Sequence, residues 1–235
     1  MNNELKKLYK SKWDNIIKDL SEINKNPDFI VKPANPLLMR HKNPEGYQSS
    51  DIRVLILGQE TNTWGGQLNP NLEKNLEIYE NWYGGGFYKK NHGHFKNHFN
   101  LILSKLNQKF PDKQVACLWS NVLKVGKSRG KGMPPNYILT EINKNLNILQ
   151  DEIDIIRPNL IIFLCSYKYD NFIKQQLQDA AFFSVENYNK NQLSEIMIPN
   201  VKYSYRTYHP KYLNFQGRKF YSDLYNKIVN ELKFN

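Results

Sequence analysis

Short runs of apolar residues alternate along this chain with segments in which apolar residues recur every three or four positions. Uninterrupted runs at 54–57, 115–119 and 160–165 predict strands buried on both faces of a sheet, and a fourth strand is expected within 197–208. Helical spacing predicts helices over 4–23, 71–83, 95–110, 137–156, 169–177 and 220–232. Because strands alternate with helices, the pattern predicts an α/β fold with a mostly parallel sheet.

The pattern indicates a single domain. It contains no internal repeat, low-complexity tract or clear domain boundary, so we expect one domain over 1–235, with a helical and irregular lead-in over about 1–50. No apolar run approaches the roughly 18 residues that would span a membrane. The N-terminus lacks the apolar core of a signal peptide, so a cytoplasmic protein is expected.

Basic residues outnumber acidic ones, 33 to 22, which gives a net charge of +11. Such a surplus favours an anionic partner such as nucleic acid, although a solvated, lysine-rich surface explains it equally well. Cys117 and Cys165 lie inside apolar runs and are interpreted as small buried side chains rather than as a disulfide. Two cysteines cannot supply the four thiolates of a typical iron–sulfur site.

Polar side chains follow three of the predicted strands. They are Gln59-Glu60 (with Thr61 and Asn62), Ser120-Asn121 and His209-Pro210. In a parallel sheet such strand ends gather along one edge, where open α/β sheets bind their ligands. A carboxylate there can activate water, an Asn can read a base edge, and a His can stabilise developing negative charge. These groups suit hydrolysis of the N-glycosidic bond of a flipped base.

Two other motifs carry less weight. Gly126-Lys127-Ser128 is not a phosphate-binding loop, because the glycine required five positions earlier is Asn121. The basic loop over 124–132 still offers Lys127, Arg129 and Lys131 to a nucleic-acid backbone, or simply to solvent. His92, His94 and His98 are spaced so that the last two can share a metal, but no nearby Cys or acidic residue completes a site. We expect a polar loop there and no metal.

In four segments the chain resembles the uracil-DNA glycosylase superfamily. Val54-Leu-Ile-Leu-Gly-Gln-Glu60 is similar to the strand that runs into the family's Gly-Gln-Asp-Pro-Tyr motif, and Leu118-Trp-Ser-Asn-Val-Leu-Lys-Val125 is similar to its second strand. Arg157-Pro-Asn-Leu-Ile-Ile-Phe-Leu164 resembles the strand of its middle sheet. His209-Pro-Lys-Tyr-Leu213 resembles its His-Pro-Ser-Pro-Leu loop. The resemblance begins near Asp51, with an apparent insertion over 64–86.

The resemblance implies a three-layer α/β/α fold around a central, mostly parallel, four-stranded sheet. It also implies a monomeric, cofactor-free hydrolase of base excision repair that flips a base out of DNA. Glu60 takes the place of the water-activating Asp, and His209 supports the leaving base. The substrate-binding candidates are Gln59, Asn62, Asn121, which reads the base edge, and Phe87, on which the base stacks. Leu213 corresponds to the wedge that fills the vacated stack, and Arg206, Lys211 and Arg218 are candidate phosphate contacts.

The motifs also depart from the family pattern. Glu60 is one methylene longer than Asp, Thr61-Asn62 replaces Pro-Tyr, and Lys211-Tyr212 replaces Ser-Pro. Three hypotheses therefore stay open: a glycosylase for a deaminated or damaged base, a nucleic-acid or modified-base binding protein that does not cut, and a small-molecule hydrolase or transferase.

Overall fold

The computed structural model describes residues 1–84 and 93–234. The strands are β1 (Ile52–Asn62), β2 (Val115–Lys127), β3 (Leu160–Leu164), β4 (Ala181–Ser184), β5 (Leu193–Met197) and β6 (Tyr203–Thr207). The helices are α1 (Asn2–Lys25), α2 (Pro44–Ser49), α3 (Leu72–Tyr79), α5 (His94–Lys109), α6 (Asn136–Asn145), α7 (Leu149–Ile156), α8 (Asp170–Gln176), α9 (Pro210–Gln216) and α10 (Arg218–Glu231). A π-helical turn, η1 (Glu80–Gly84), and a 3₁₀ turn, η2 (Tyr167–Tyr169), complete the assigned elements. No helix within this described part is long and apolar enough to cross a membrane.

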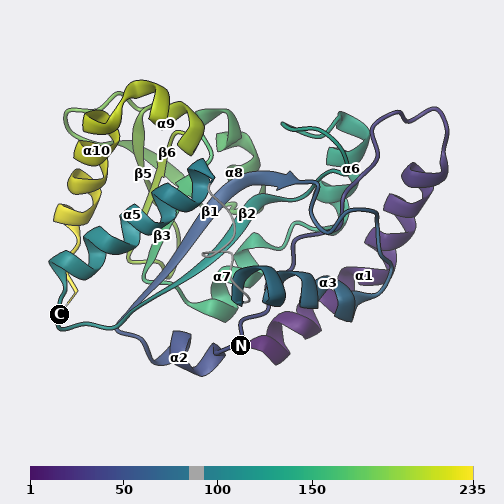
Figure 1. The fold of residues 1–235 in the computed structure, drawn as a ribbon, viewed down its shortest axis with the longest axis horizontal. Helices are drawn as coiled ribbons and strands as arrows, with labels where there is room; N and C mark the ends of the chain where they lie inside the picture. The colour runs from purple at the N-terminus through teal and green to yellow at the C-terminus, as the bar shows by residue number, and fades with distance from the viewer. Residues whose placement is uncertain (85–92, 235) are drawn as a thin grey trace. The chain divides into compact units, whose positions relative to one another are not determined.

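The strands form one six-stranded sheet in the order β2-β1-β3-β6-β5-β4, and Figure 1 labels all of them except β4. β3 pairs in parallel with both β1 and β6, whereas β5 runs antiparallel to β6, and β4 to β5. The α/β class and the mostly parallel sheet flanked by helices are confirmed. The expected number of four strands is wrong, because β4 and β5 were not predicted. β4 has only four residues and is only partly buried, with Phe183 exposed, so it does not resemble a central strand that is buried on both faces.

The chain divides into two compact units, and the strands β1 and β2 contribute residues to both. The first unit comprises Met1–Pro44, Glu60–Phe87 and Ser120–Ile155, and the second comprises Glu45–Gln59, Tyr88–Trp119 and Ile156–Asn235. The expectation of a single domain stays a prediction.

In the first unit a long amphipathic helix packs over a buried polar network. α1 buries one face, formed by Leu5, Tyr9, Trp13, Ile16, Leu20 and Ile23, and packs against α6. The Tyr9 hydroxyl donates to Glu152 Oε1 at 2.8 Å, and Glu152 forms an ion pair with Lys124. Lys124 Nζ also donates to Ser120 Oγ at 2.7 Å. Because both charged side chains are fully buried, each needs these partners to offset its loss of hydration.

In the second unit three helices pack on one another beside the fully buried strand β3. α10 contacts both α5 and α9, and α5 also contacts α9 (Figure 1). The β3–β6 register pairs Leu164 with Thr207, so both strands end at the same level of the sheet. The short helix α9 then begins directly after His209, with Pro210 in its first turn, where a missing backbone N–H costs nothing.

Several boundaries differ from the predictions. β1 and β2 continue to Asn62 and Lys127, so residues 124–127 belong to a strand rather than to the expected loop. The predicted helix over 137–156 is interrupted between α6 and α7. A continuous helix would turn Ile148 by about 200° away from Leu146, whereas the break allows both side chains to be buried.

Candidate functional site

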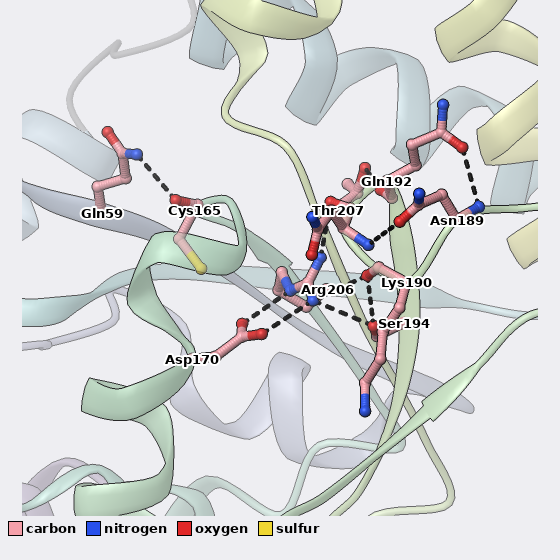
Figure 2. A network of polar contacts seen from close by, with 10 residues as sticks. Gln59, Cys165, Asp170, Asn189, Lys190, Gln192, Ser194, Arg206 and Thr207 are labelled. Atoms are coloured by element: carbon pink, nitrogen blue, oxygen red, sulfur yellow. Dashed lines mark hydrogen bonds and ion pairs between the residues drawn. The ribbon is translucent and has the colours of Figure 1, made fainter.

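The polar residues expected beyond β1 and β2 lie within these strands. Gln59 and Glu60 belong to β1, and Ser120 and Asn121 belong to β2, so the prediction that they follow the strand ends is wrong. The half-buried Gln59 donates from Nε2 to the Cys165 carbonyl oxygen at 2.8 Å (Figure 2). This bond fixes the Gln59 side chain against the chain that leaves β3, both in the second unit.

The exits of β3 and β6 are joined by hydrogen bonds. The Ser166 N–H donates to the Thr207 carbonyl oxygen at 2.9 Å, and Thr207 Oγ1 donates to the Gln192 carbonyl oxygen at 2.8 Å. Ser166 has a φ of 75°, a conformation that L-residues rarely adopt. The segment that carries His209 therefore leaves a well-anchored point of the sheet.

Arg206 is a structural residue in this unit. Its guanidinium is fully buried and binds both carboxylate oxygens of Asp170, at 2.9 and 3.0 Å (Figure 2). It also donates to Ser194 Oγ and to the carbonyl oxygens of Lys190 and Asn191. Burial raises the pKa of Asp170, and the charge of Arg206 opposes that shift. The expected phosphate contact by Arg206 is wrong, because its side chain is fully buried and its guanidinium already binds Asp170 inside the protein.

His209 lies directly after β6 and caps α9. Its Nδ1 accepts a hydrogen bond from the Lys211 backbone N–H at 3.2 Å, so the proton of the neutral ring is on Nε2. Burial lowers the pKa of His209, and the nearby His94, His98 and Lys211 act in the same direction, so that together they bring it to about 4. At neutral pH the ring is therefore an uncharged hydrogen-bond donor.

A chain of side-chain hydrogen bonds passes through His98 and His94, which lie near His209. His98 Nδ1 lies 2.7 Å from the Tyr225 hydroxyl, and His98 Nε2 lies 2.9 Å from Asn214 Oδ1. Asn214 Nδ2 in turn lies 2.5 Å from His94 Nδ1. Since the Asn214 oxygen can only accept, His98 carries its proton on Nε2 and Tyr225 donates to Nδ1, while the Asn214 amide group donates to His94 Nδ1. This hydrogen-bond chain joins α5, α9 and α10.

The hydrogen bonds of His98 also argue against a metal ion shared between His94 and His98. Both ring nitrogens of His98 are engaged by Tyr225 and Asn214, so His98 has no free lone pair for a shared ion. His92 lies outside the described residues. Over 1–84 and 93–234 there is no cluster of His, Cys, Asp or Glu side chains that could hold a metal ion.

The remaining substrate candidates belong mostly to the first unit. Glu60 is half-buried, Asn62 is exposed, and Asn121 is only 3% exposed. The strands are held tightly here: a Cβ at Gly126 would lie 1.7 Å from the Thr61 carbonyl oxygen, so only glycine fits. Phe87 lies outside the described residues.

The candidate DNA contacts divide by exposure. Arg129, Lys131, Lys211 and Arg218 are exposed, and Lys127 is half-buried. Arg129 also lines a hollow of about 630 Å³ in the first unit. Leu213, expected to be the wedge, is fully buried, so that prediction is wrong. Its neighbours Tyr212 and Phe215 are the exposed aromatic side chains of α9.

Sequence reasoning missed Asn214, Tyr225 and Ser166. Asn214 lies one helical turn after Pro210, but α9 itself was not predicted, so nothing marked this side chain as facing the histidines. Tyr225 lies within the last predicted helix, over 220–232, but the sequence suggested no role for it. A residue with positive φ such as Ser166 leaves no trace in the sequence when it is not glycine.

Comparison with known families gives an independent result. A family model described as "Uracil DNA glycosylase superfamily" matches residues 45–233, which is most of the chain and contains all four resembling motifs. No curated protein matches the chain.

Proposed function

Because the chain belongs to the uracil DNA glycosylase superfamily, we propose that it hydrolyses the N-glycosidic bond of a deaminated or otherwise damaged base flipped out of DNA. Family membership supports a DNA glycosylase-like function with DNA as the partner. The choice of base and the residue roles below belong to the proposal. The observation that carries them is the neutral His209, held with its Nε2–H free of the bond that caps α9.

His209 supplies the group that the bond-breaking step needs. When the C1′–N bond breaks, its electron pair stays with the departing base, and negative charge develops on the base. A preorganised donor that faces this charge stabilises the transition state without any proton transfer. A neutral imidazole donates from Nε2 and keeps its proton, which a pKa of about 4 ensures at neutral pH.

Glu60 and Asn121 take the roles that the family resemblance assigns to their positions. Glu60 accepts a proton from the attacking water as the water oxygen bonds to C1′. Asn121 offers both a donor and an acceptor to the base edge, and its burial on β2 restricts its side chain. Gln59, Asn62 and Phe87 complete the proposed base-binding set, and the enzyme is taken to be a monomer without a cofactor or metal.

Four exposed cations and the half-buried Lys127 are proposed as phosphate contacts that position the DNA without reading its sequence. They are Lys127, Arg129, Lys131, Lys211 and Arg218. Arg206 and Leu213 are removed from the proposed DNA interface because both are buried.

A second candidate function is a DNA reader of the same fold that does not cut. It is favoured by specific residues: Glu60 in place of Asp, and Thr61-Asn62 in place of Pro-Tyr. Such a protein binds DNA with a steep salt dependence but releases no base.

An abasic-site assay separates these functions. Purified protein is incubated with single- and double-stranded oligonucleotides that contain uracil, hypoxanthine, xanthine or an alkylated base, and strand breakage is measured after alkali. We expect cleavage by the wild type and a rate reduced about 100-fold or more in His209→Asn, the usual cost of losing one such donor. Glu60→Gln is expected to be similarly impaired. His41→Asn is the matched control, since burial also lowers the pKa of His41 but no role is proposed for it.

DNA binding without abasic product from any of these substrates would favour the non-cutting reader. Cleavage that His209→Asn and Glu60→Gln leave unchanged would establish a glycosylase and refute the residue roles.

A further inference from the structure

The outer face of α9 is unusual, because it exposes large aromatic side chains. Pro210 and Leu213 are buried, while Tyr212 is 47% and Phe215 76% exposed. Residues three apart share a helix face, so Tyr212 and Phe215 present their rings on the same side of α9. Both lie within one or two turns of His209.

Two more tyrosines adjoin this face. The rings of Tyr208 and Tyr212 have their centroids 4.5 Å apart at an interplanar angle of 60°. Tyr167 is 41% exposed and follows Ser166, whose N–H is bonded to Thr207, the residue before Tyr208. Burial raises the pKa of Tyr208, and Tyr212 and Tyr167 raise it further, which agrees with all three hydroxyls lying near one another.

Cations accompany these rings. Lys168 and Lys211 are exposed and are the sequence neighbours of Tyr167 and Tyr212. Exposed aromatic rings interspersed with lysines are the composition by which proteins bind single strands, with the bases stacking on the rings and the phosphates facing the cations. The charge of the surface fits a polyanion better than an apolar protein partner.

We propose that Tyr167, Tyr208, Tyr212 and Phe215 form an aromatic surface that binds unpaired bases of single-stranded DNA next to His209. The inference rests on the proposed function only in taking DNA as the ligand. Because Leu213 is buried, the last loop offers no aliphatic wedge to fill a vacated position in a duplex. A stacking surface there suits a substrate whose bases are already unpaired, so the surface sets a preference for single strands.

Binding is measured by fluorescence anisotropy with undamaged DNA, so the test does not depend on cleavage. The probes are a labelled thymidine oligonucleotide of about 16 nucleotides, the upper range of single-strand site sizes, and a duplex of the same length. Tyr212→Ala and Phe215→Ala are each expected to weaken single-strand binding about tenfold, as for loss of one stacked base. The duplex affinity should change much less.

Two variants serve as controls. Tyr212→Phe keeps the ring and should retain near wild-type affinity. Phe183→Ala removes another exposed aromatic side chain, 49% exposed on the edge strand β4, and should have no effect. Thermal unfolding of each variant confirms that it is folded.

The proposal is overturned if the double variant Tyr212→Ala/Phe215→Ala binds the single strand like the wild type. It is also overturned if single-strand and duplex affinities fall equally, or if the wild type shows no single-strand binding at low salt. A protein that binds single strands through these rings but yields no abasic product would refute the proposed function and leave this inference standing.

Discussion

A histidine that stays neutral in mildly acidic solution is the residue on which the proposed chemistry depends, and its burial has a measurable effect on stability. Burial lowers the pKa of His209 to about 4, against about 6.5 in the unfolded chain. Between these values the unfolded state binds more protons than the native state, so this group makes stability fall as pH falls from 6.5 to 4. The full shift corresponds to at most about 3 kcal/mol.

The prediction is tested with His209→Asn, which has no ring to protonate. Urea unfolding of both proteins at pH 7 and at pH 5 gives the loss of unfolding free energy on acidification. We expect the wild type to lose about 1–2 kcal/mol more than the variant over this interval. Histidines that do not interact with His209 contribute equally to both proteins and cancel in the difference. Equal losses would mean that His209 has an ordinary pKa and is not held in a buried, neutral state.

Single residues also show what the sequence could not reveal. The sequence marked His209 through the His-Pro motif, and the structure gives it the proton arrangement that its proposed role needs. Arg206, three positions earlier, was a candidate phosphate contact under the family resemblance, although an arginine is usually exposed and this one is not. Its burial follows from its place on β6, a central strand of the sheet, and from Asp170, which no sequence pattern pairs with it.

At the scale of elements, the helix α9 is held in place by side chains from its neighbours. Seven residues are too few for a helix to be stable alone, and the chain from Tyr225 through His98 and Asn214 to His94 joins α9 to α5 and α10. Since His209 caps this helix, we infer that the hydrogen-bond chain positions His209 and keeps it shielded from water.

The variant Asn214→Ala breaks this chain in the middle. We expect the unfolding free energy to fall by about 1–3 kcal/mol, because two histidine nitrogens lose a partner. We also expect the pKa of His209 to rise towards 6.5 as the helix loosens, measured by NMR titration of the imidazole protons. Asn226→Ala is the matched control: it removes the 2.6 Å bond from Lys105 that also joins α5 and α10, but Asn226 is not part of the hydrogen-bond chain through His98. If the pKa of His209 is the same in both variants as in the wild type, the hydrogen-bond chain has no positioning role.

The elements that the sequence predicted are those with a strong repeating pattern. β1, β3 and α1 bury a complete run or stripe of apolar side chains and were recognised from it. α9 was missed because Tyr212 and Phe215, its large apolar side chains apart from Leu213, face outward, so its sequence has no amphipathic signal. β5 has only five residues and mixes buried with exposed positions, and its place beside β6 depends on long-range pairing.

At the scale of the whole molecule, the net charge of +11 has two explanations that the sequence left open: a solvated surface or a surface for DNA. The superfamily match favours DNA, and salt dependence decides between them. Each phosphate contact releases a counterion, so the affinity for a single strand should fall with salt with a slope of about −0.7 per contact on logarithmic axes. If the five proposed cations all engage DNA, the slope is about −3.5.

Individual variants distinguish local contacts from total charge. Arg218→Ala is expected to reduce the magnitude of the slope by about 0.7, the share of one contact. Lys144→Ala changes the net charge by the same amount, but its ammonium group already pairs with Asp19 at 2.8 Å and with Glu141 at 3.4 Å, so its slope should match the wild type. Equal effects of the two substitutions would mean that only the overall charge matters. A wild-type slope near zero would assign the surplus of lysines to solvent and revive the small-molecule hydrolase, because a DNA glycosylase must neutralise phosphates to hold its substrate.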